Sequence, residues 1–186
     1  MTLRIETERL TLRPLSLTDV DDVTAYQSLE HAVRYVPFNP RTLDEVIAAI
    51  TRQTPSEHLT TPGDFFILGM EHRQTGHIIG QVNIGLETTT PKTASIGYLT
   101  HPDHWRNSYT REAITALIDY AIEHEHIEQF TAVIVDQNEP SIRFAQTLGM
   151  HQTGSRLDPE SPCTAGTPDM LTDWAMSATD WLKRRA

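Results

Sequence analysis

A short stretch of the chain, residues 105–111, places charged and hydroxyl side chains at the start of a predicted helix. Arg106, Ser108 and Arg111 flank the point near Tyr109 where this helix is predicted to begin. The N-terminus of a helix offers unpaired N–H groups and the positive end of the helix dipole, and both favour an anion. The stretch therefore suits a phosphate group or a similar anion.

A second stretch of polar residues opens the next predicted helix. Asn138 is a predicted N-cap, Pro140 lies in the first turn, where proline is tolerated, and Gly149 is placed to end the helix. Ser141 either satisfies a backbone donor of the first turn or reaches a ligand. Arg143 is either an exposed helix arginine or a ligand of a phosphate group.

Two histidines upstream of these helices raise the question of a metal site. His101 and His104 are three residues apart, a spacing that a zinc ion can use. However, His124 and His126 lie far along the chain, and no cysteine is close to any of them. We therefore expect surface or supporting histidines and no bound metal.

Hydrophobic periodicity predicts the strands and helices that carry these stretches. Alternating or continuous apolar runs predict strands, and apolar residues at three- and four-residue spacing predict helices. Strands are predicted at residues 9–13, 65–70, 78–86, 93–99, 130–135 and 170–177, and helices at residues 18–26, 42–50, 109–125 and 138–148. This order, β-α-α-β-β-β-α-β-α-β, predicts an α/β fold with a mixed, mostly antiparallel central sheet flanked by helices.

Two of the predicted helices begin with capping boxes. Thr18 with Asp21 starts the first helix, and Thr42 with Glu45 starts the second. The second helix also carries apolar residues at the i, i+3, i+4 and i+7 positions of one face, which are Leu43, Val46, Ile47 and Ile50.

Composition and charge restrict the class of protein. With 38% hydrophobic and 22% charged residues, the 186-residue chain is typical of one globular domain, residues 1–186. The formal charge of −10 disfavours a nucleic-acid partner and favours a cationic substrate. A local basic pocket can still bind a small phosphorylated cofactor.

The cysteine count and the hydropathy indicate where the protein works. Cys163 is the only cysteine of the sequence, so no internal disulfide forms, and a loop is predicted around it at residues 158–168. Neither a signal peptide nor a membrane-spanning stretch is apparent. We therefore expect a cytoplasmic protein without a membrane partner.

Several short motifs, in their order and spacing, resemble those of a known family. These segments are Glu8–Pro14, Gly76–Gly80, Ile96–Leu99, His101–Trp105, Glu112–Ala113, Asn138–Arg143 and Leu148–Met150. Together they resemble the GNAT superfamily of N-acetyltransferases, nearest to its RimJ/RimL-type branch of ribosomal-protein N-terminal acetyltransferases. The resemblance spans nearly the whole chain.

The resemblance implies an enzyme that moves an acetyl group from acetyl-CoA to a primary amine by direct attack in a ternary complex. The amine would belong to a protein N-terminus or to a small molecule, and a homodimer is left open. In this fold, the strands at residues 93–99 and 130–135 splay apart and offer an edge to the amides of pantetheine. Backbone N–H groups near Leu99 and Thr100 would polarise the thioester carbonyl, and Ser141 would protonate the departing thiolate.

The same resemblance implies where acetyl-CoA binds, with an unusual phosphate loop. Close relatives carry Trp-Gly-x-Gly-Tyr-Ala, in which glycine reaches positive φ and lets the backbone approach phosphate. Here Arg106 and Ser108 replace both glycines, and Asn107 between them tolerates positive φ better than most residues. Either side chains replace bare backbone here, or the phosphate cradle is weakened. The implied contacts of the cofactor are Leu99, Thr100, Arg106, Asn107, Ser108, Tyr109, Thr110, Arg111, Asn138, Ser141 and Arg143.

No general base can be named from the sequence. Relatives often carry Glu just before the Ile-Gly-Tyr motif, and Ser95 holds that position here. Glu87 and His101 are the nearest candidates along the chain. The missing carboxylate and glycines also motivate an alternative, a non-catalytic acyl-CoA-binding or interaction protein on the same fold.

Overall fold

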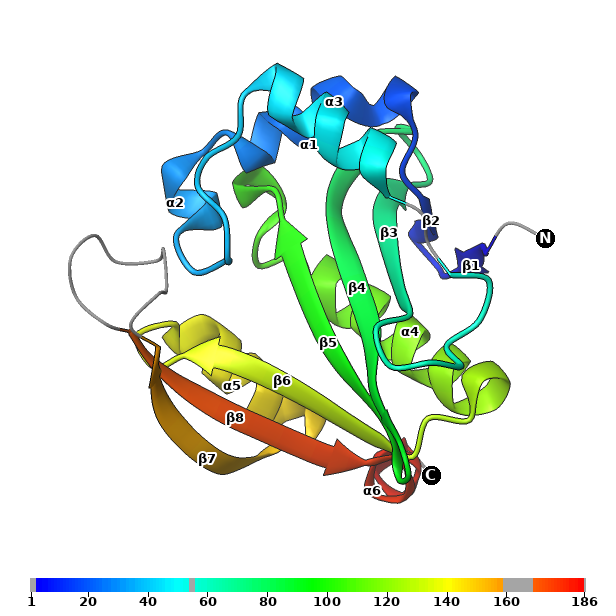
Figure 1. Cartoon of the computed structure of the whole chain (residues 1–186). Helices are drawn as coiled ribbons and strands as arrows, with labels where there is room; N and C mark the ends of the chain where they lie inside the picture. The colour runs from blue at the N-terminus through cyan, green and yellow to red at the C-terminus, as the bar shows by residue number, and fades with distance from the viewer. Residues whose placement is uncertain (1–2, 54–55, 159–168, 186) are drawn as a thin grey trace.

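The computed structural model describes residues 3–53, 56–158 and 169–185, and one sheet runs through this part of the chain (Figure 1). The strand order is β1-β2-β3-β4-β5-β6-β8-β7. Neighbouring strands are antiparallel except β5 and β6, which are parallel. The strands are β1 Ile5–Glu6, β2 Leu10–Pro14, β3 Phe65–His72, β4 Ile78–Thr89, β5 Lys92–Thr100, β6 Gln129–Val135, β7 His151–Asp158 and β8 Asp169–Ser177. The predicted mixed, mostly antiparallel sheet is confirmed.

Helices cover the sheet, and the polar stretches noted in the sequence lie at the start of two of them, α4 and α5. The helices are α1 Val20–Gln27, α2 Glu30–Val33, α3 Leu43–Arg52, α4 Tyr109–Glu125, α5 Glu139–Leu148 and α6 Ala178–Arg185. No helix of the described chain is long and apolar enough to cross a membrane.

Of the two helices with predicted capping boxes, α3 begins as predicted and α1 does not. Thr42 and Glu45 form the expected capping box of α3. For α1, the predicted cap at Thr18 is wrong, because a short 3-10 turn, Leu17–Asp19, precedes the helix. Asp19 Oδ2 accepts hydrogen bonds from the N–H and the hydroxyl of Ser16, so the reciprocal cap lies two residues earlier.

Two hydrophobic clusters hold the helices against the sheet. The larger one joins α4 to the sheet through fully buried residues such as Ile114 and Leu117. The smaller one packs Val23 of α1 and Val46 of α3 against Leu99 of β5. The end of β5 is therefore anchored between two layers of packed side chains.

Two strands were not predicted, the two-residue β1 and the longer β7. β7, at the edge of the sheet, has mostly exposed residues, so its sequence lacks the apolar alternation that marks a half-buried strand. The loop predicted at residues 158–168 lies, apart from Asp158, outside the described residues, as does Cys163.

The parallel strands β5 and β6 splay apart, as predicted. They are paired at Thr93–Ser95 of β5 and Gln129–Thr131 of β6. Beyond these pairs the two strands diverge, and Figure 1 shows the opening between them widening away from the β4–β5 hairpin. The backbone edge at the end of β5 is left open toward this gap.

Candidate active site

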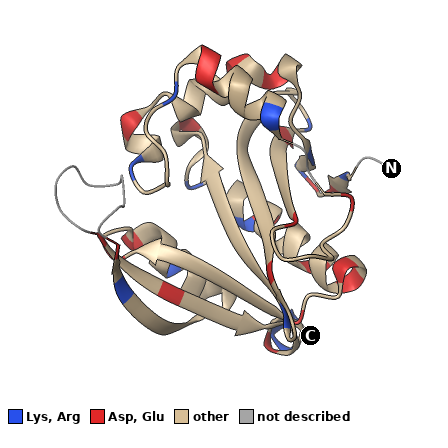
Figure 2. Ribbon diagram, viewed as in Figure 1, with Lys and Arg blue, Asp and Glu red and all other residues tan. Residues whose placement is uncertain are grey.

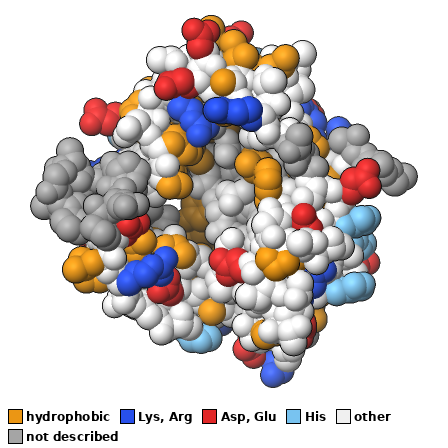
Figure 3. All heavy atoms as spheres, in the orientation of Figure 1, with side chains coloured by type: hydrophobic (Ala, Val, Ile, Leu, Met, Phe, Trp, Pro, Cys, Tyr) orange, Lys and Arg blue, Asp and Glu red, His pale blue; other side chains and the backbone are white. Residues whose placement is uncertain are grey.

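A cleft of about 1130 Å³ occupies the opening in the sheet. Its lining includes Gln81 and Asn83 from β4, Tyr98 from β5, and Ser141 and Phe144 from α5. Figure 3 shows this face of the molecule hollowed, with hydrophobic side chains around the hollow. A cleft at this position can hold an elongated ligand along the free edge of β5.

The cleft brings together most of the residues expected from the sequence. Those in its lining are Leu99, Thr100, Arg106, Ser108, Thr110, Arg111, Asn138 and Ser141. Those outside the lining are Asn107, Tyr109, Arg143, Glu87 and His101.

The loop before α4 keeps a left-handed backbone at the two positions where glycine was expected. Arg106 and Ser108 both have φ of 63°, whereas Asn107 between them does not have a positive φ. A left-handed residue with a side chain costs roughly 1–2 kcal/mol, so the loop holds this shape against its local preference. The loop therefore has the backbone geometry of a glycine-containing loop, with side chains added.

Contacts from distant elements hold this loop in place. Trp105 Nε1 donates to Thr100 O at 2.8 Å, which ties the loop to the end of β5. Arg9 Nη1 donates to Asn107 O at 3.0 Å, and the Arg9 guanidinium lies 4.4 Å from the centre of the Tyr109 ring. These contacts offset the cost of the unusual backbone.

Glu112 in turn fixes Arg9. Its carboxylate accepts from Arg9 Nε and Arg9 N, each at 2.7 Å, and from the hydroxyl of Thr7 at 2.6 Å. Burial alone would raise the pKa of Glu112, but these hydrogen bonds outweigh it and hold that pKa below its usual value. The supporting role of Arg9 was not foreseen, because its partner lies about a hundred residues away in the sequence.

The start of α4 fits a pyrophosphate. Ser108 is the N-cap in the left-handed conformation, and its side chain makes no capping hydrogen bond. The first N–H groups of a helix have no partner within the helix, so those of Tyr109, Thr110 and Arg111 are suited to an anion. Arg106 and Arg111 line the cleft beside them and add positive charge.

The free edge of β5 directs backbone donors into the opening. Glu128, just before β6, donates its N–H to Lys92 O, so the even-numbered residues of β5 turn their backbone groups toward β6. Backbone groups alternate in direction along a strand. The N–H groups of Ile96, Tyr98 and Thr100 therefore face the opening, where an amide-bearing ligand can pair with the edge.

By the same alternation, Leu99 turns its backbone toward β4, where it pairs with Gln81. Of the two predicted donors, Thr100 is thus the one that faces the opening. Gly80 lies opposite Thr100, and a Cβ at that position would come within 2.5 Å of Leu99 O. Glycine at position 80 therefore allows β4 to approach the end of β5 closely.

Ser141 is held by contacts from two sides. Asn138 caps α5, and its Oδ1 accepts from the N–H of Ser141 at 3.3 Å. The hydroxyl of Tyr98 donates to Ser141 Oγ at 2.9 Å, and the Tyr98 ring packs edge-on against Phe144 with centroids 5.2 Å apart. Burial raises the pKa of Tyr98 above its usual value, and the bond to Ser141 acts in the opposite direction. Tyr98 was missed as a functional residue, although it belongs to the Ile-Gly-Tyr motif.

The two base candidates lie away from Ser141. Glu87 is exposed, sits at an irregularity of β4 near the hairpin, and accepts a hydrogen bond from Thr131 Oγ1 at 2.8 Å. His101 Nδ1 accepts from the N–H of Asp103, so this nitrogen is already engaged. Within the described chain, no Asp or Glu lines the cleft, and His31 is the imidazole that does.

A metal site is not found in the part of the chain that the structure describes. The rings of His101 and His104 lie 5.8 Å apart and contact each other edge-on. No group of three or more His, Cys, Asp and Glu among the described residues is arranged to hold an ion.

Comparison with known proteins assigns the family. A family model described as an acetyltransferase (GNAT) domain matches residues 9–151. The chain belongs to the GNAT acetyltransferase family. It is 27% identical over 150 residues to YoaA, an uncharacterized N-acetyltransferase of Bacillus subtilis (strain 168), and the match covers 81% of this chain and 84% of YoaA. The protein is thus an acetyltransferase.

Two solved structures share the fold of this GNAT acetyltransferase. One is the spermidine N-acetyltransferase of Vibrio cholerae in complex with CoA and spermine, with a TM-score of 0.78, 15% identity, and coverage of 95% of this chain and 99% of that chain. The other, also from Vibrio cholerae, is described as a candidate ribosomal-protein-serine acetyltransferase, with a TM-score of 0.74, 22% identity, and coverage of 94% and 97%.

Proposed function

We propose that this protein transfers an acetyl group from acetyl-CoA to a primary amine by direct attack within a ternary complex. The observation that carries the proposal is the Tyr98–Ser141 hydrogen bond, which places a hydroxyl in the cleft at the opening between β5 and β6. Because Tyr98 donates in this pair, the proton of Ser141 is left free for a ligand. Ser141 is therefore the group best placed to protonate a leaving thiolate.

The residues that would hold acetyl-CoA follow from the cleft. The start of α4, with Arg106 and Arg111, would bind the pyrophosphate, and the open edge of β5 would pair with the pantetheine amides. The Vibrio cholerae spermidine N-acetyltransferase, which shares the fold, is described in complex with CoA. Acetyl-CoA supplies the activated acetyl group as a thioester.

Three groups of this chain would act on the reaction. The Thr100 N–H would donate to the carbonyl oxygen as it gains negative charge when the carbon–nitrogen bond forms. Ser141 would give its proton to sulfur as the carbon–sulfur bond breaks, and the proton that the amine loses would restore the Ser141 hydroxyl. Tyr98 would orient the Ser141 hydroxyl. Much of the rate would come from holding the amine and the thioester in contact.

The left-handed backbone at Arg106 and Ser108 supports binding of the cofactor phosphates at this loop. The absence of glycines motivated the non-catalytic alternative, yet the loop adopts the backbone shape for which glycine would be expected. For the acceptor, we propose an α-amine, as in the RimJ/RimL-type branch. The described cleft lining contains no Asp or Glu, which supports an amine that is partly neutral without a strong base.

Binding and turnover of acetyl-CoA test the proposal. Ligand at 100 times its dissociation constant should stabilise the fold by about 2.7 kcal/mol, which calorimetry and a melting curve can detect. Arg111→Gln should weaken binding. Arg143→Gln is the matched control, because Arg143 lies outside the cleft and pairs with Glu139 at 2.8 Å. An unmoved melting temperature at millimolar acetyl-CoA would refute cofactor binding, and binding without acetylation of any amine would refute catalysis.

A further inference from the structure

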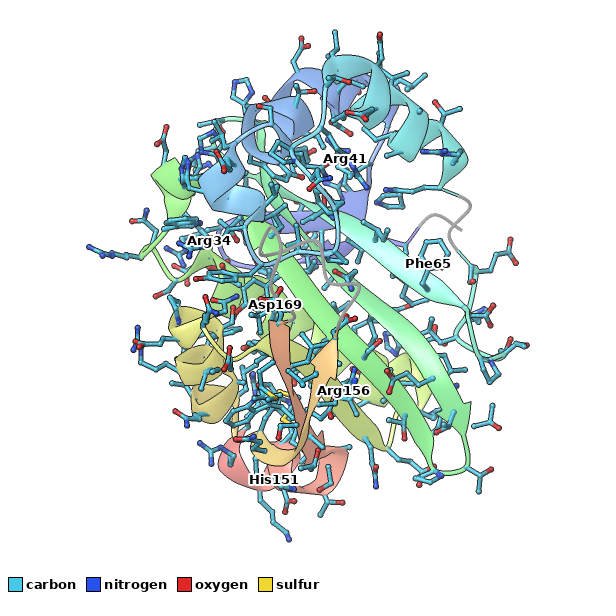
Figure 4. All side chains as sticks on the ribbon, turned by 60° about the vertical axis from the view of Figure 1, so that its left-hand side comes forward. Arg34, Arg41, Phe65, His151, Arg156 and Asp169 are labelled. Atoms are coloured by element: carbon cyan, nitrogen blue, oxygen red, sulfur yellow. The ribbon has the colours of Figure 1, made fainter. Side chains whose placement is uncertain are left out.

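The cleft has a second basic region, remote in sequence from the phosphate loop. Arg41 follows α2 and is half-buried in the cleft lining. Its Nη1 donates to Gln27 Oε1 at 3.0 Å, and its guanidinium lies 3.9 Å from the centre of the Phe38 ring. Figure 4 shows Arg41 between the α1–α3 helices and the sheet.

Among the described residues, no carboxylate forms an ion pair with Arg41 or with the neighbouring Arg52. Burial lowers the pKa of Arg41, the charge of Arg52 acts in the same direction, and Glu45 acts against them. Glu45 itself is bonded to Thr42. Figure 3 shows Lys and Arg side chains on the rim of the hollow below the α1–α3 helices. Two like charges at one rim, neither of them in contact with a described carboxylate, favour a bound anion.

A chain of hydrogen bonds connects Arg41 to the reacting end of β5. Gln27 accepts from Arg41 and donates through Nε2 to Gln81 Oε1 at 2.9 Å. Gln81 lies opposite Leu99, the residue before Thr100. Arg41 is thus fixed relative to the proposed carbonyl-binding site.

The two basic regions of the cleft lie on different elements. Figure 2 shows Lys and Arg on the chain between α2 and α3 and on the loop that follows β5. The second of these regions contains Arg106, at the proposed pyrophosphate site. The first is therefore available to the other reactant, the acceptor.

We propose that the acceptor is a primary amine that also carries a carboxylate, and that the Arg41 guanidinium binds this carboxylate. This inference rests on the proposed acetyl transfer and specifies its substrate class. It is opposite to the cationic substrate that the net charge of −10 favours, because the described cleft lining contains arginines and no carboxylate. Polyamines, which carry no anion, are accordingly poor acceptors.

The carboxylate has two sources, which paired probes distinguish. The first set of pairs tests an α-carboxylate, because free amino acids are compared with their α-carboxamides. In the second, C-terminally amidated tripeptides beginning with Asp or Glu are compared with those beginning with Asn or Gln. Binding of each probe to the full chain saturated with CoA is measured by calorimetry, and acetylation with acetyl-CoA is measured separately.

In at least one set, the carboxylate-bearing probe should bind roughly 10- to 100-fold more tightly than its neutral partner, as expected for one charge-assisted hydrogen bond. Arg41→Gln should reduce this preference to about threefold or less, and Arg41→Lys, which keeps the charge, should retain part of it. Arg34→Gln, outside the cleft lining, should keep the full preference. The affinity for CoA should be unchanged in the Arg41 variants, since an effect there would assign Arg41 to the cofactor instead.

The outcomes separate this inference from the proposed function. Acetylation of amines without any preference for a carboxylate overturns the inference and leaves the transferase activity intact. The inference is equally overturned if the preference survives in folded Arg41→Gln, or if polyamines bind best. Carboxylate-dependent binding without acetylation supports the Arg41 site and refutes the proposed reaction.

Discussion

The hydroxyl of Tyr98 on β5 donates a 2.9 Å hydrogen bond to Ser141 Oγ on α5, across the opening of the sheet. The bond links β5 to the helix that follows β6, and with Tyr98 as the donor the proton of Ser141 stays free. Burial raises the pKa of Tyr98, so its phenol stays protonated beyond the pH at which an ordinary tyrosine ionises. Tyr98 therefore keeps a proton to donate throughout the neutral and moderately alkaline range.

Replacing Ser141 by Ala should lower kcat far more than it raises the KM for acetyl-CoA. The hydroxyl is needed as charge develops on sulfur, and loss of a general acid typically costs about 10²–10⁴ in rate. Steady-state kinetics on the folded variant measures both constants. Thr51→Ala, which removes an exposed hydroxyl bonded to Ile47 O, is the control and should keep wild-type kcat. An unchanged kcat in Ser141→Ala would leave Ser141 as an ordinary first-turn serine.

The double variant Arg106→Gly/Ser108→Gly should be more stable than the wild type yet bind CoA more weakly. Glycine relieves the left-handed strain at both positions, and after its larger entropy loss the gain is about 1–2 kcal/mol in total. Both side chains line the cleft, so their removal should lower the affinity for phosphate. Denaturant melts and calorimetry measure the two effects.

Asn107→Gly is the control for this pair, because Asn107 has no positive φ and lies outside the cleft lining. It should bring no gain in stability. Tighter binding of CoA by the double variant would mean that bare backbone is the better phosphate ligand. An unchanged affinity would remove the pyrophosphate from this loop.

Glu112→Gln should destabilise the protein and weaken CoA binding together. The change leaves Arg9 without its carboxylate, and Arg9 holds Asn107 O in the loop. We expect a loss of about 1–3 kcal/mol at pH 7. Because the pKa of Glu112 is lowered in the folded state, its contribution is present above the unfolded value, near 4.3, and is lost as pH falls through the folded value. The stabilities of the wild type and the variant should thus begin to converge as pH falls below about 4.3.

Glu139→Gln removes an exposed carboxylate paired with Arg143 and serves as the matched control, with an expected loss of less than about 0.5 kcal/mol. Equal losses in both variants at neutral pH would contradict the special role of the Glu112 network. A stability difference that persists at acid pH would show that it does not arise from the ionised carboxylate.

The preferred acceptor should be an α-amine and not a lysine side chain. Only a neutral amine attacks the thioester, and at pH 7.5 roughly a third of α-amines are neutral, against about one lysine in a thousand. No carboxylate of the described chain lines the cleft to remove the extra proton. Peptides with a free or a blocked N-terminus, each carrying one lysine, test this by mass spectrometry. Acetylation confined to the lysine would contradict it, whereas kcat/KM rising with pH to about 8 would agree with it.

The sequence predicted most of the fold because its patterns were strong. Val46 and Ile50 of α3 are buried as their spacing required, although Leu43 and Ile47 of the same stripe remain exposed. The edge strand β7 escaped prediction because a strand with mostly exposed residues carries little periodic signal. The first cap was misplaced because Asp19 pairs with Arg13, a contact between elements that no local pattern reveals.

The candidate site was predictable only where local chemistry determines it. Asn138 caps α5 as expected, and Ser141 lies in the cleft lining. The positive φ appeared on Arg106 and Ser108, not on the more permissive Asn107, because the loop shape is imposed by contacts from Arg9 and Trp105. Contacts of this kind depend on the folded chain and have no signature in the sequence.

Because β5 and β6 diverge, a bound substrate would supply backbone pairing that the sheet itself lacks. In the described strands, the two portions of the sheet are joined by the pairs from Thr93–Ser95 to Gln129–Thr131. Pantetheine amides bound in the opening would extend this short region of pairing along β5. We therefore expect the ligand-free molecule to fluctuate about this short region of pairing more than the ligand-bound molecule does.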